Sequence, residues 1–218
     1  MTEQCTDPTR ASGAWRRAAA FLCVAVAAIA VASALDAPVA EYFARRQLSF
    51  SLELYAMFRL AGYLPLWLVV AVALALIDSP LGWRAAWSRG GVLLTSVVLA
   101  GASAEILKMV VRRERPSVPF TDYVFRPWWQ DTFSSGGLGW PSSHVAVAFG
   151  AVWVLSRLYP RAAVVWILVG CACAVSRLVG NDHYVSDVVG AAVLAYGVMM
   201  LLPLQRRPPQ FSPVAPPR

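Results

Sequence analysis

The stretch Ala162–Val175, AAVVWILVGCACAV, holds no charged side chain and no regular alternation of polar and apolar residues. This pattern favours a buried or lipid-facing helix over a half-exposed strand. Five similar stretches occur along the chain, at Ala18–Leu35, Gly62–Ile77, Gly91–Leu107, His144–Leu158 and Asp187–Leu204. Since a helix needs about 20 mostly apolar residues to cross a bilayer, we predict an all-α, polytopic membrane protein, built as a six-transmembrane-helix bundle.

The composition of the whole chain agrees with this prediction. Of 218 residues, 58% are hydrophobic and only 14% are charged, whereas soluble domains carry about 25% charged residues. The shortage of charge is explained if much of the surface faces lipid. The length suits one domain, so we expect a membrane domain over residues 15–205, a polar N-terminal tail over 1–14 and a Pro-rich, disordered tail over 206–218.

Two local features allow other interpretations of the membrane segments. Arg16 and Arg17 precede an apolar run that ends in small residues, which resembles a cleavable secretory signal. The run is long for a signal and no soluble domain follows, so we expect it to stay as a membrane helix. None of the four cysteines has partners at zinc-site spacing, and we expect them to be small buried apolar residues. They are Cys5, Cys23, Cys171 and Cys173.

The basic residues give a weak preference for one topology. Six spans place both termini on one side of the membrane. With the termini inside, ten basic residues lie in inner segments and nine in outer segments. Three of the outer residues, Lys108, Arg115 and Arg177, are candidates for chemistry, which leaves ten against six. The positive-inside rule then favours inner termini.

Three polar segments lie at helix ends that this topology places on the outer side. They are KMVVRRERP at 108–116, PSSH at 141–144 and SRLVGNDHYVSD at 176–187. The only two histidines of the chain, His144 and His183, fall within them. We therefore expect the three segments to form one site.

The residue types suit a phosphate group. Lys108, Arg115 and Arg177 supply cationic donors, and the planar fork of arginine can bind two phosphate oxygens. Ser142 and Ser143 stand where a helix begins, with free backbone N–H groups available to an anion. Phosphoryl transfer is catalysed mainly by positioning and charge stabilisation, so these groups predict a phosphate site without a metal ion or another cofactor.

The remaining three groups suit the chemical steps. His183 and Asp187 are four residues apart and share a face if a helix begins near Tyr184. A carboxylate beside an imidazole fixes its tautomer, and histidine can act as a covalent nucleophile. His144 is then available to protonate the departing alkoxide and to activate water.

Structural roles are the alternative for each residue taken singly. Ser142 and Asp187 suit helix capping, and a basic side chain at a span end commonly reaches to the interface. The coincidence of these groups at three helix ends favours chemistry. Glu105, one turn before Lys108, needs a partner within the membrane, and we expect it to orient Lys108.

The three segments resemble the signature of the type-2 phosphatidic acid phosphatase superfamily, which reads Lys-x6-Arg-Pro, Pro-Ser-Gly-His and Ser-Arg-x5-His-x3-Asp. With the six-span layout, the resemblance covers about residues 15–205. It implies that His183 attacks phosphorus to form a phosphohistidine, that Asp187 supports it and that His144 is the general acid. The implied phosphate-binding residues are Lys108, Arg115, Ser142, Ser143 and Arg177.

One position departs from the signature. Ser143 stands where the family has glycine, a residue that permits close backbone approach to an anion. The serine changes the geometry of the phosphate loop or adds a hydroxyl donor, which bears on substrate specificity more than on the reaction.

The resemblance implies a metal-independent lipid phosphatase, multi-pass in the bacterial inner membrane, with its site facing the periplasm or the cell exterior. Its expected partners are the lipid bilayer and a phosphorylated lipid of the phosphatidic acid, phosphatidylglycerol phosphate, undecaprenyl pyrophosphate or lipid A type. The clustering of basic residues between apolar runs argues against nucleic acid. The alternatives are a lipid phosphotransferase on the same site, a vanadium haloperoxidase-like enzyme and a small transporter. The sequence leaves the oligomeric state open.

The segment between the first two motifs adds an expectation about the membrane. It is rich in aromatic residues, which favour the headgroup level of a bilayer. We expect this stretch to anchor at the interface or to border the lipid entrance. The residues are Phe120, Tyr123, Phe125, Trp128, Trp129, Phe133 and Trp140.

Overall fold

The computed structural model describes residues 8–46 and 51–203, and this part of the chain is helical. The elements in order are α1 (Pro8–Ala34), α2 (Asp36–Arg46), α3 (Leu52–Leu60), α4 (Leu64–Asp78), η1 (Ser79–Leu81), α5 (Trp83–Val111), α6 (Ser143–Leu158), η2 (Pro160–Ala162), α7 (Ala163–Val179) and α8 (Val185–Leu201). The described residues contain no named strand. Two isolated bridges, Arg113 to Phe125 and Glu114 to Leu138, organise the long segment between α5 and α6.

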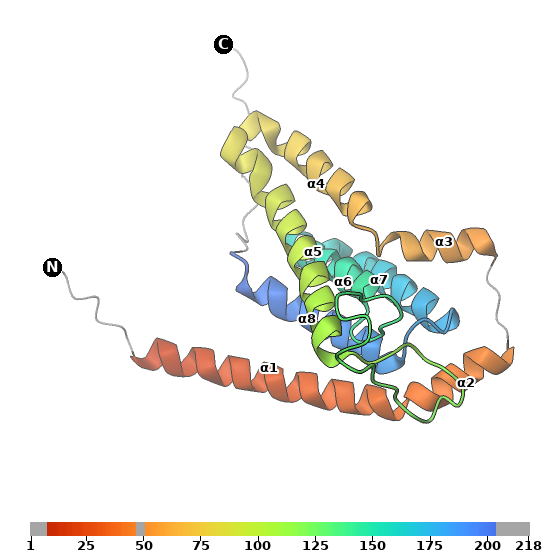
Figure 1. The fold of residues 1–218 in the computed structure, drawn as a ribbon. Helices are drawn as coiled ribbons and strands as arrows, with labels where there is room; N and C mark the ends of the chain where they lie inside the picture. The colour runs from red at the N-terminus through yellow and green to blue at the C-terminus, as the bar shows by residue number, and fades with distance from the viewer. Residues whose placement is uncertain (1–7, 47–50, 204–218) are drawn as a thin grey trace, which may run out of the picture.

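Each of the six predicted apolar stretches lies largely within one helix of the described chain, so the all-α prediction is confirmed (Figure 1). By length and hydropathy, three segments of the described chain are suited to cross a membrane: Trp15–Ala34, Trp87–Val111 and Pro160–Val179. Glu53–Leu60 and Leu64–Asp78 qualify together as a fourth, bent by 56°. The apolar helices α6 and α8 are shorter.

The region between the first two predicted spans contains two helices that the sequence analysis missed. Both α2 and α3 are short, and both pack against α7. At the N-terminus, α1 already begins at Pro8, within the segment expected to be a tail. Residues 1–7, 47–50 and the predicted C-terminal tail lie outside the described residues.

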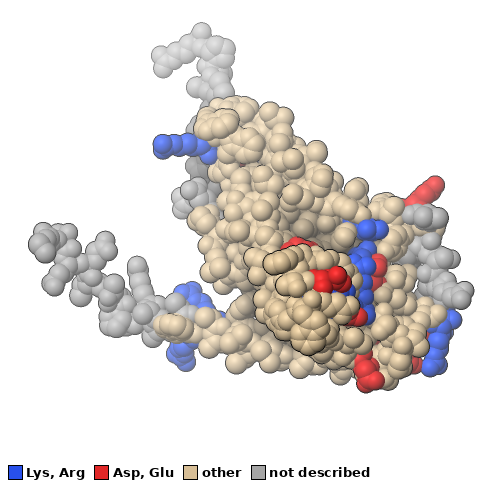
Figure 2. Space-filling view, in the orientation of Figure 1, with Lys and Arg blue, Asp and Glu red and all other residues tan. Residues whose placement is uncertain are grey.

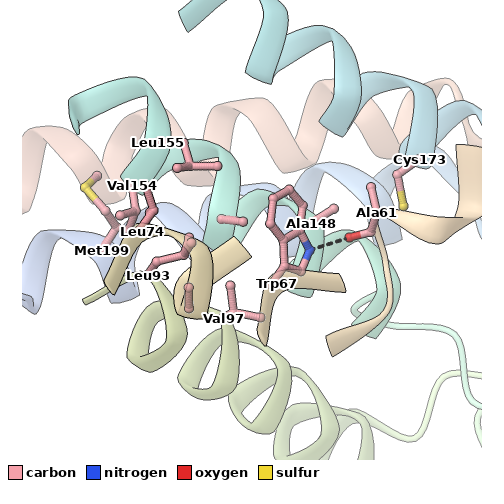
Figure 3. Packing of buried hydrophobic residues seen from close by; sticks show 12 residues of the cluster. Ala61, Trp67, Leu74, Leu93, Val97, Ala148, Val154, Leu155, Cys173 and Met199 are labelled. Atoms are coloured by element: carbon pink, nitrogen blue, oxygen red, sulfur yellow. Dashed lines mark hydrogen bonds between the residues drawn. The ribbon is translucent and has the colours of Figure 1, made fainter. Parts of the chain in front are cut away.

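The core is formed where α6 packs against α5, α7 and α8. Small residues bring these helices close: a methyl group added at Gly150 would lie 3.1 Å from the Cα atom of Val97 on α5. Trp67 of α4 fills the core and donates from Nε1 to the carbonyl oxygen of Ala61 at 2.8 Å (Figure 3). Of the described cysteines only Cys173 is buried.

The expectation of buried cysteines was therefore wrong for Cys23 and Cys171, which are exposed. Both lie within apolar helices, α1 and α7, whose outward faces are themselves apolar. An apolar residue in such a helix has no need to face the protein core.

The alternating directions of the helices bring four helix ends together. The C-terminal ends of α5 and α7 meet the N-terminal ends of α6 and α8, and the Ser142 N–H donates to the Asp187 carbonyl at 3.1 Å. In Figure 2, much of the visible surface is uncharged; the Asp and Glu side chains in view lie near the middle and right, whereas Lys and Arg side chains lie there and at the left as well. The converging helix ends bring acidic and basic groups together at one end of an apolar bundle.

Candidate active site

The structure brings the eight predicted site residues to these four helix ends. Lys108 lies in the last turn of α5, and Arg115 follows in the segment beyond it. Ser142 is the N-cap of α6, and Ser143 and His144 form its first turn. Arg177 lies in the last turn of α7, His183 in the loop that follows, and Asp187 in the first turn of α8.

His183 and Asp187 contact each other as the spacing predicted. Tyr184 is the N-cap of α8, and the Nδ1 atom of His183 lies 3.3 Å from the Oδ2 atom of Asp187. An ionised carboxylate only accepts hydrogen bonds, so Nδ1 carries the hydrogen and Nε2 keeps its lone pair. Asp187 also accepts from the Tyr184 N–H at 2.8 Å, so it caps the helix and orients the imidazole at once.

The imidazole of His183 is kept neutral by its surroundings. Burial lowers its pKa below the ordinary value, and the charges of Arg177 and Lys108 lower the pKa further, while the bond to Asp187 acts in the opposite direction. The net direction is downward. A neutral imidazole at physiological pH is the form that can act as a nucleophile.

A buried network behind Asp187 was not predicted. Arg113 donates to both the Asp187 carboxylate and the Ser186 hydroxyl. Asp36, at the start of α2, accepts from the Ser186 N–H at 2.8 Å and from the Tyr123 hydroxyl at 2.8 Å.

The guanidinium of Arg113 also lies beside two aromatic rings that contact each other edge-to-face, 4.7 Å from the centroid of Tyr123 and 5.4 Å from that of Tyr184. The side chains of Arg113, Asp36 and Asp187 are 8%, 2% and 0% exposed. Buried groups of opposite charge compensate one another. Asp187 is therefore positioned by Arg113 as well as by His183.

Two of the predicted phosphate-binding residues, Arg115 and Arg177, form ion pairs with the same carboxylate. Asp182 pairs with Arg177 at 2.8 Å and with Arg115 at 3.2 Å. Tyr55 of α3 completes the group: its hydroxyl lies 3.1 Å from Asp182 and 3.3 Å from Arg177. Asp182 therefore holds both guanidinium groups beside His183, its neighbour in the sequence.

The third predicted cation is held in the same way. Lys108 lies 3.0 Å from Glu105, as expected, and both groups also contact the Ser143 hydroxyl. The serine that replaces the family glycine thus bridges a lysine and a glutamate. Its hydroxyl contributes to the positioning of Lys108, a role that the single sequence could not reveal.

His144 is enclosed by the junction between α3 and α4. Its ring packs edge-on against Tyr63, with centroids 5.1 Å apart. A Cβ atom added at Gly62 would lie only 2.7 Å from the His144 Cβ, so glycine is required there for the imidazole to fit. The Arg59 guanidinium lies 5.5 Å from the centroid of the Tyr63 ring, which adds a further basic residue near the site.

Several buried polar atoms at the site have no hydrogen-bond partner among the described residues. They are the Ser142 hydroxyl, the His144 Nε2 atom and the Arg177 Nε atom. Buried polar atoms are nearly always bonded in folded proteins. Two donors and an imidazole nitrogen without partners, at adjoining helix ends, are suited to the oxygens of an anion.

An apolar groove of about 420 Å³ leads away from these atoms. Its polar end is formed by Glu105, Ser143 and His144. Its walls are apolar residues of the α3–α4 junction and of one face each of α5 and α6; they are Leu64, Pro65, Val97, Val98, Ala102 and Val147. The groove joins the charged helix ends to the apolar flank of the bundle.

Two arginines, Arg112 and Arg126, stabilise the segment between α5 and α6 through bonds within the segment. Arg112 donates to the carbonyl oxygens of Arg126 and Gln130, and Arg126 pairs with Glu114 at 3.0 Å. Five aromatic side chains remain exposed on it: Tyr123, Phe125, Trp128, Trp129 and Phe133. This agrees with an interfacial location for the segment.

The site's supporting residues were missed for different reasons. Asp36 and Tyr55 are far away in the sequence, and nothing in their local pattern links them to the motifs. Arg113 lies inside the first motif, at a position that the motif leaves unspecified. One signal was available for Asp36. An acid that directly follows an apolar segment needs a partner.

Comparisons with known proteins identify the family and the fold of this chain. A model of the PAP2 superfamily matches residues 89–209. Over 108 residues the chain is 31% identical to a lipid A 1-phosphatase of Rhizobium etli, a match that covers 50% of this chain and 45% of that protein. The crystal structure of the first transmembrane PAP2 type phosphatidylglycerolphosphate phosphatase, from Bacillus subtilis, has a TM-score of 0.57 at 16% identity, covering 84% of this chain and 92% of the other. The last match shows a shared fold, and the family model spans more than half of the chain: this protein belongs to the PAP2 superfamily.

Proposed function

We propose that this protein is an integral membrane phosphatase that hydrolyses a phosphate or pyrophosphate monoester of a membrane lipid, removing one terminal phosphate through a phosphohistidine and without a metal ion. The observation that carries the proposal is the convergence of two imidazoles with unpartnered buried donors at four helix ends. The resemblance of the three motifs to the family signature implies that they form the phosphate site. The apolar groove beside His144 supports a substrate with a hydrocarbon portion.

The reaction follows from the roles of the two histidines. The Nε2 atom of His183 attacks phosphorus, and the bond between phosphorus and the lipid oxygen breaks while His144 donates a proton to that oxygen. His144 then removes a proton from water, whose oxygen attacks the phosphohistidine and releases inorganic phosphate and free His183. Asp187 stabilises the charge that develops on the imidazole in both steps.

The phosphate itself would be held by Lys108, Arg115 and Arg177, with the Ser142 hydroxyl and the first N–H groups of α6. In the ligand-free structure the three cations are paired with Glu105 and Asp182. Substrate oxygens would share or replace these carboxylates. Arginine and lysine then neutralise the charge of the transferred group, which is the main source of catalysis in phosphoryl transfer.

We further propose that α1, α4, α5, α6, α7 and α8 all cross the bilayer. Helices α6 and α8, with 16 and 17 residues, span about 24–26 Å, close to the lower limit for crossing. Leaving out basic residues that are buried, paired with a buried acid or assigned to the phosphate increases the difference between the inner and outer counts. Of the nine outer basic residues, five are buried or assigned to the phosphate (Lys108, Arg112, Arg113, Arg115 and Arg177) and are set aside. The inner residue Arg89, which is paired with the buried acid Asp78, is set aside as well.

The remaining count is nine inner against four outer basic residues. This supports a bacterial inner-membrane protein with inner termini and the site facing outward.

The relatives act on lipid A and on phosphatidylglycerol phosphate by name. These two lipids, with phosphatidic acid and undecaprenyl pyrophosphate, form the substrate panel to be tested first.

The decisive experiment compares wild type with His183→Ala in detergent, in the presence of EDTA. We expect phosphate release from the correct lipid to fall by at least about 10³-fold in the variant. The variant should remain folded, with an unfolding midpoint lowered by the loss of a buried side chain and of its bond to Asp187. His144→Ala should be slow in the second step, so that brief exposure to ³²P-labelled lipid leaves an acid-labile label on His183. Undiminished turnover in His183→Ala would remove the proposed nucleophile, and full inhibition of wild type by EDTA would contradict metal independence.

Transfer to an acceptor other than water is the main enzymatic alternative on this site. Measuring free phosphate with and without candidate lipid acceptors separates the two reactions. If phosphate appears only on an acceptor, the protein is a phosphotransferase.

A further inference from the structure

A second groove, of about 600 Å³, lies between α1, α6 and α8. One wall is the face of α1 that runs from Arg17 to Val24, and another is the face of α8 from Val189 to Met200. Trp153 of α6 forms the floor between them. Except for Arg17 and the hydroxyl of Tyr196, the side chains that line this groove are apolar.

The groove exists because α1 and α8 pack closely over only part of their length. Toward the C-terminal end of α1, Ala25 and Ala32 are 7% and 3% exposed. Toward its N-terminal end, Ala20 and Val24 are exposed although they line the groove. Figure 1 shows the two helices diverging in this direction. The result is a wedge that is wide at the N-terminal end of α1.

The wide end of the wedge is basic. Arg17 lines it directly. Arg157, at the end of α6, contacts two other lining residues, with its Nη2 atom 3.4 Å from the Tyr196 hydroxyl and 3.6 Å from the Met200 sulfur. No aspartate or glutamate is among the described residues that line the groove. An apolar slot that ends at two arginines is complementary to a hydrocarbon chain attached to an anionic group.

This groove is separate from the candidate active site. His144 and Arg157 lie at opposite ends of α6, and thirteen residues of helix separate them by about 20 Å. On α8 the active-site residue Asp187 is likewise at the first turn and Met200 at the last. A lipid in this groove cannot present its phosphate to His183.

We propose that the groove binds one phospholipid with an anionic headgroup. Its acyl chain lies along Phe21, Val193 and Trp153, and its phosphate faces Arg17 and Arg157. The site belongs to the membrane leaflet opposite the catalytic one. Each basic side chain near a membrane surface contributes about fivefold to the binding of anionic lipid, so the two arginines together predict a preference of about 30-fold.

Native mass spectrometry of the full chain in detergent tests this proposal. The probes are dioleoyl-phosphatidylglycerol, which has a phosphodiester and no phosphate monoester, and dioleoyl-phosphatidylcholine. We expect one phosphatidylglycerol per protein, with the affinity reduced about 30-fold in Arg17→Gln/Arg157→Gln. The matched control is Arg16→Gln/Arg161→Gln, which removes two exposed arginines of the same end that do not line the groove; it should bind as wild type does.

A second variant tests the apolar slot without changing charge. Ala20→Phe fills the groove from α1, where the residue is exposed and the fold tolerates a larger side chain, and it should weaken phosphatidylglycerol binding at least tenfold. Equal affinity for the two lipids in wild type would overturn the proposal. So would loss of binding in Lys108→Met, which would locate the lipid in the candidate active site, or the appearance of a protein dimer with no bound lipid.

Discussion

Replacing Arg113 with methionine should damage both the stability and the chemistry of this protein. The substitution keeps much of the side-chain volume and leaves Asp36 and Asp187, which are 2% and 0% exposed, without their cation. Removing one partner of a buried ion pair costs about 3–5 kcal/mol. The loss of stacking on Tyr123 and Tyr184 adds about 0.5–2 kcal/mol.

For a chain of this size, 1 kcal/mol shifts the unfolding midpoint by roughly 2–4 °C. We therefore expect the midpoint of Arg113→Met to fall by roughly 10 °C in detergent, measured by circular dichroism at one fixed scan rate because membrane proteins often unfold irreversibly. Lipid phosphate release should also fall, since Asp187 no longer holds His183 in one orientation.

Arg115→Met is the matched control, because it removes a neighbouring arginine that is 42% exposed and pairs with a partly exposed acid. Such surface pairs contribute at most about 1 kcal/mol, so its midpoint should stay close to that of wild type while KM rises. If Arg113→Met unfolds within about 2 °C of wild type, the buried network does not stabilise the site and this reasoning fails.

Three other perturbations test separate parts of the site. Gly62→Ala would place a methyl group 2.7 Å from the His144 Cβ, so we expect a loss of about 1–3 kcal/mol and a lower kcat, whereas Gly91→Ala, with open space around it, should be neutral in the same assays. Because the pKa of His183 is lowered, its neutral form persists as pH falls. The acidic limb of kcat/KM, corrected for substrate titration measured by ³¹P NMR, should therefore lie below about pH 6.5, and a limb above pH 7 would contradict this. Asp182→Asn leaves two arginines without their shared acid, so inhibition by inorganic vanadate should strengthen about tenfold; unchanged inhibition would show that the acid does not compete with the anion.

The sequence predicted the six apolar helices and the contact between His183 and Asp187 because both depend on local patterns. An apolar run such as Ala162–Val175 specifies a helix without reference to the rest of the chain. The spacing from His183 to Asp187 specifies a shared helix face in the same way, and the structure has both residues in contact.

The positions that were missed depend on contacts between distant segments. Asp36 and Ser186 are 150 residues apart, and Tyr55 and Asp182 are 127 apart. One sequence contains no signal for such pairs. Ser143 was noticed only as a departure from a pattern, since its contact with Glu105 depends on how closely α5 and α6 pack.

The bond between Asp36 and Ser186 has a consequence for how the protein is made. Asp36 follows α1, and Ser186 belongs to α8. During synthesis this carboxylate stays without its Ser186 donors until α8 has been made and has packed against α2. The buried network that holds Asp187 from behind is complete only from that point.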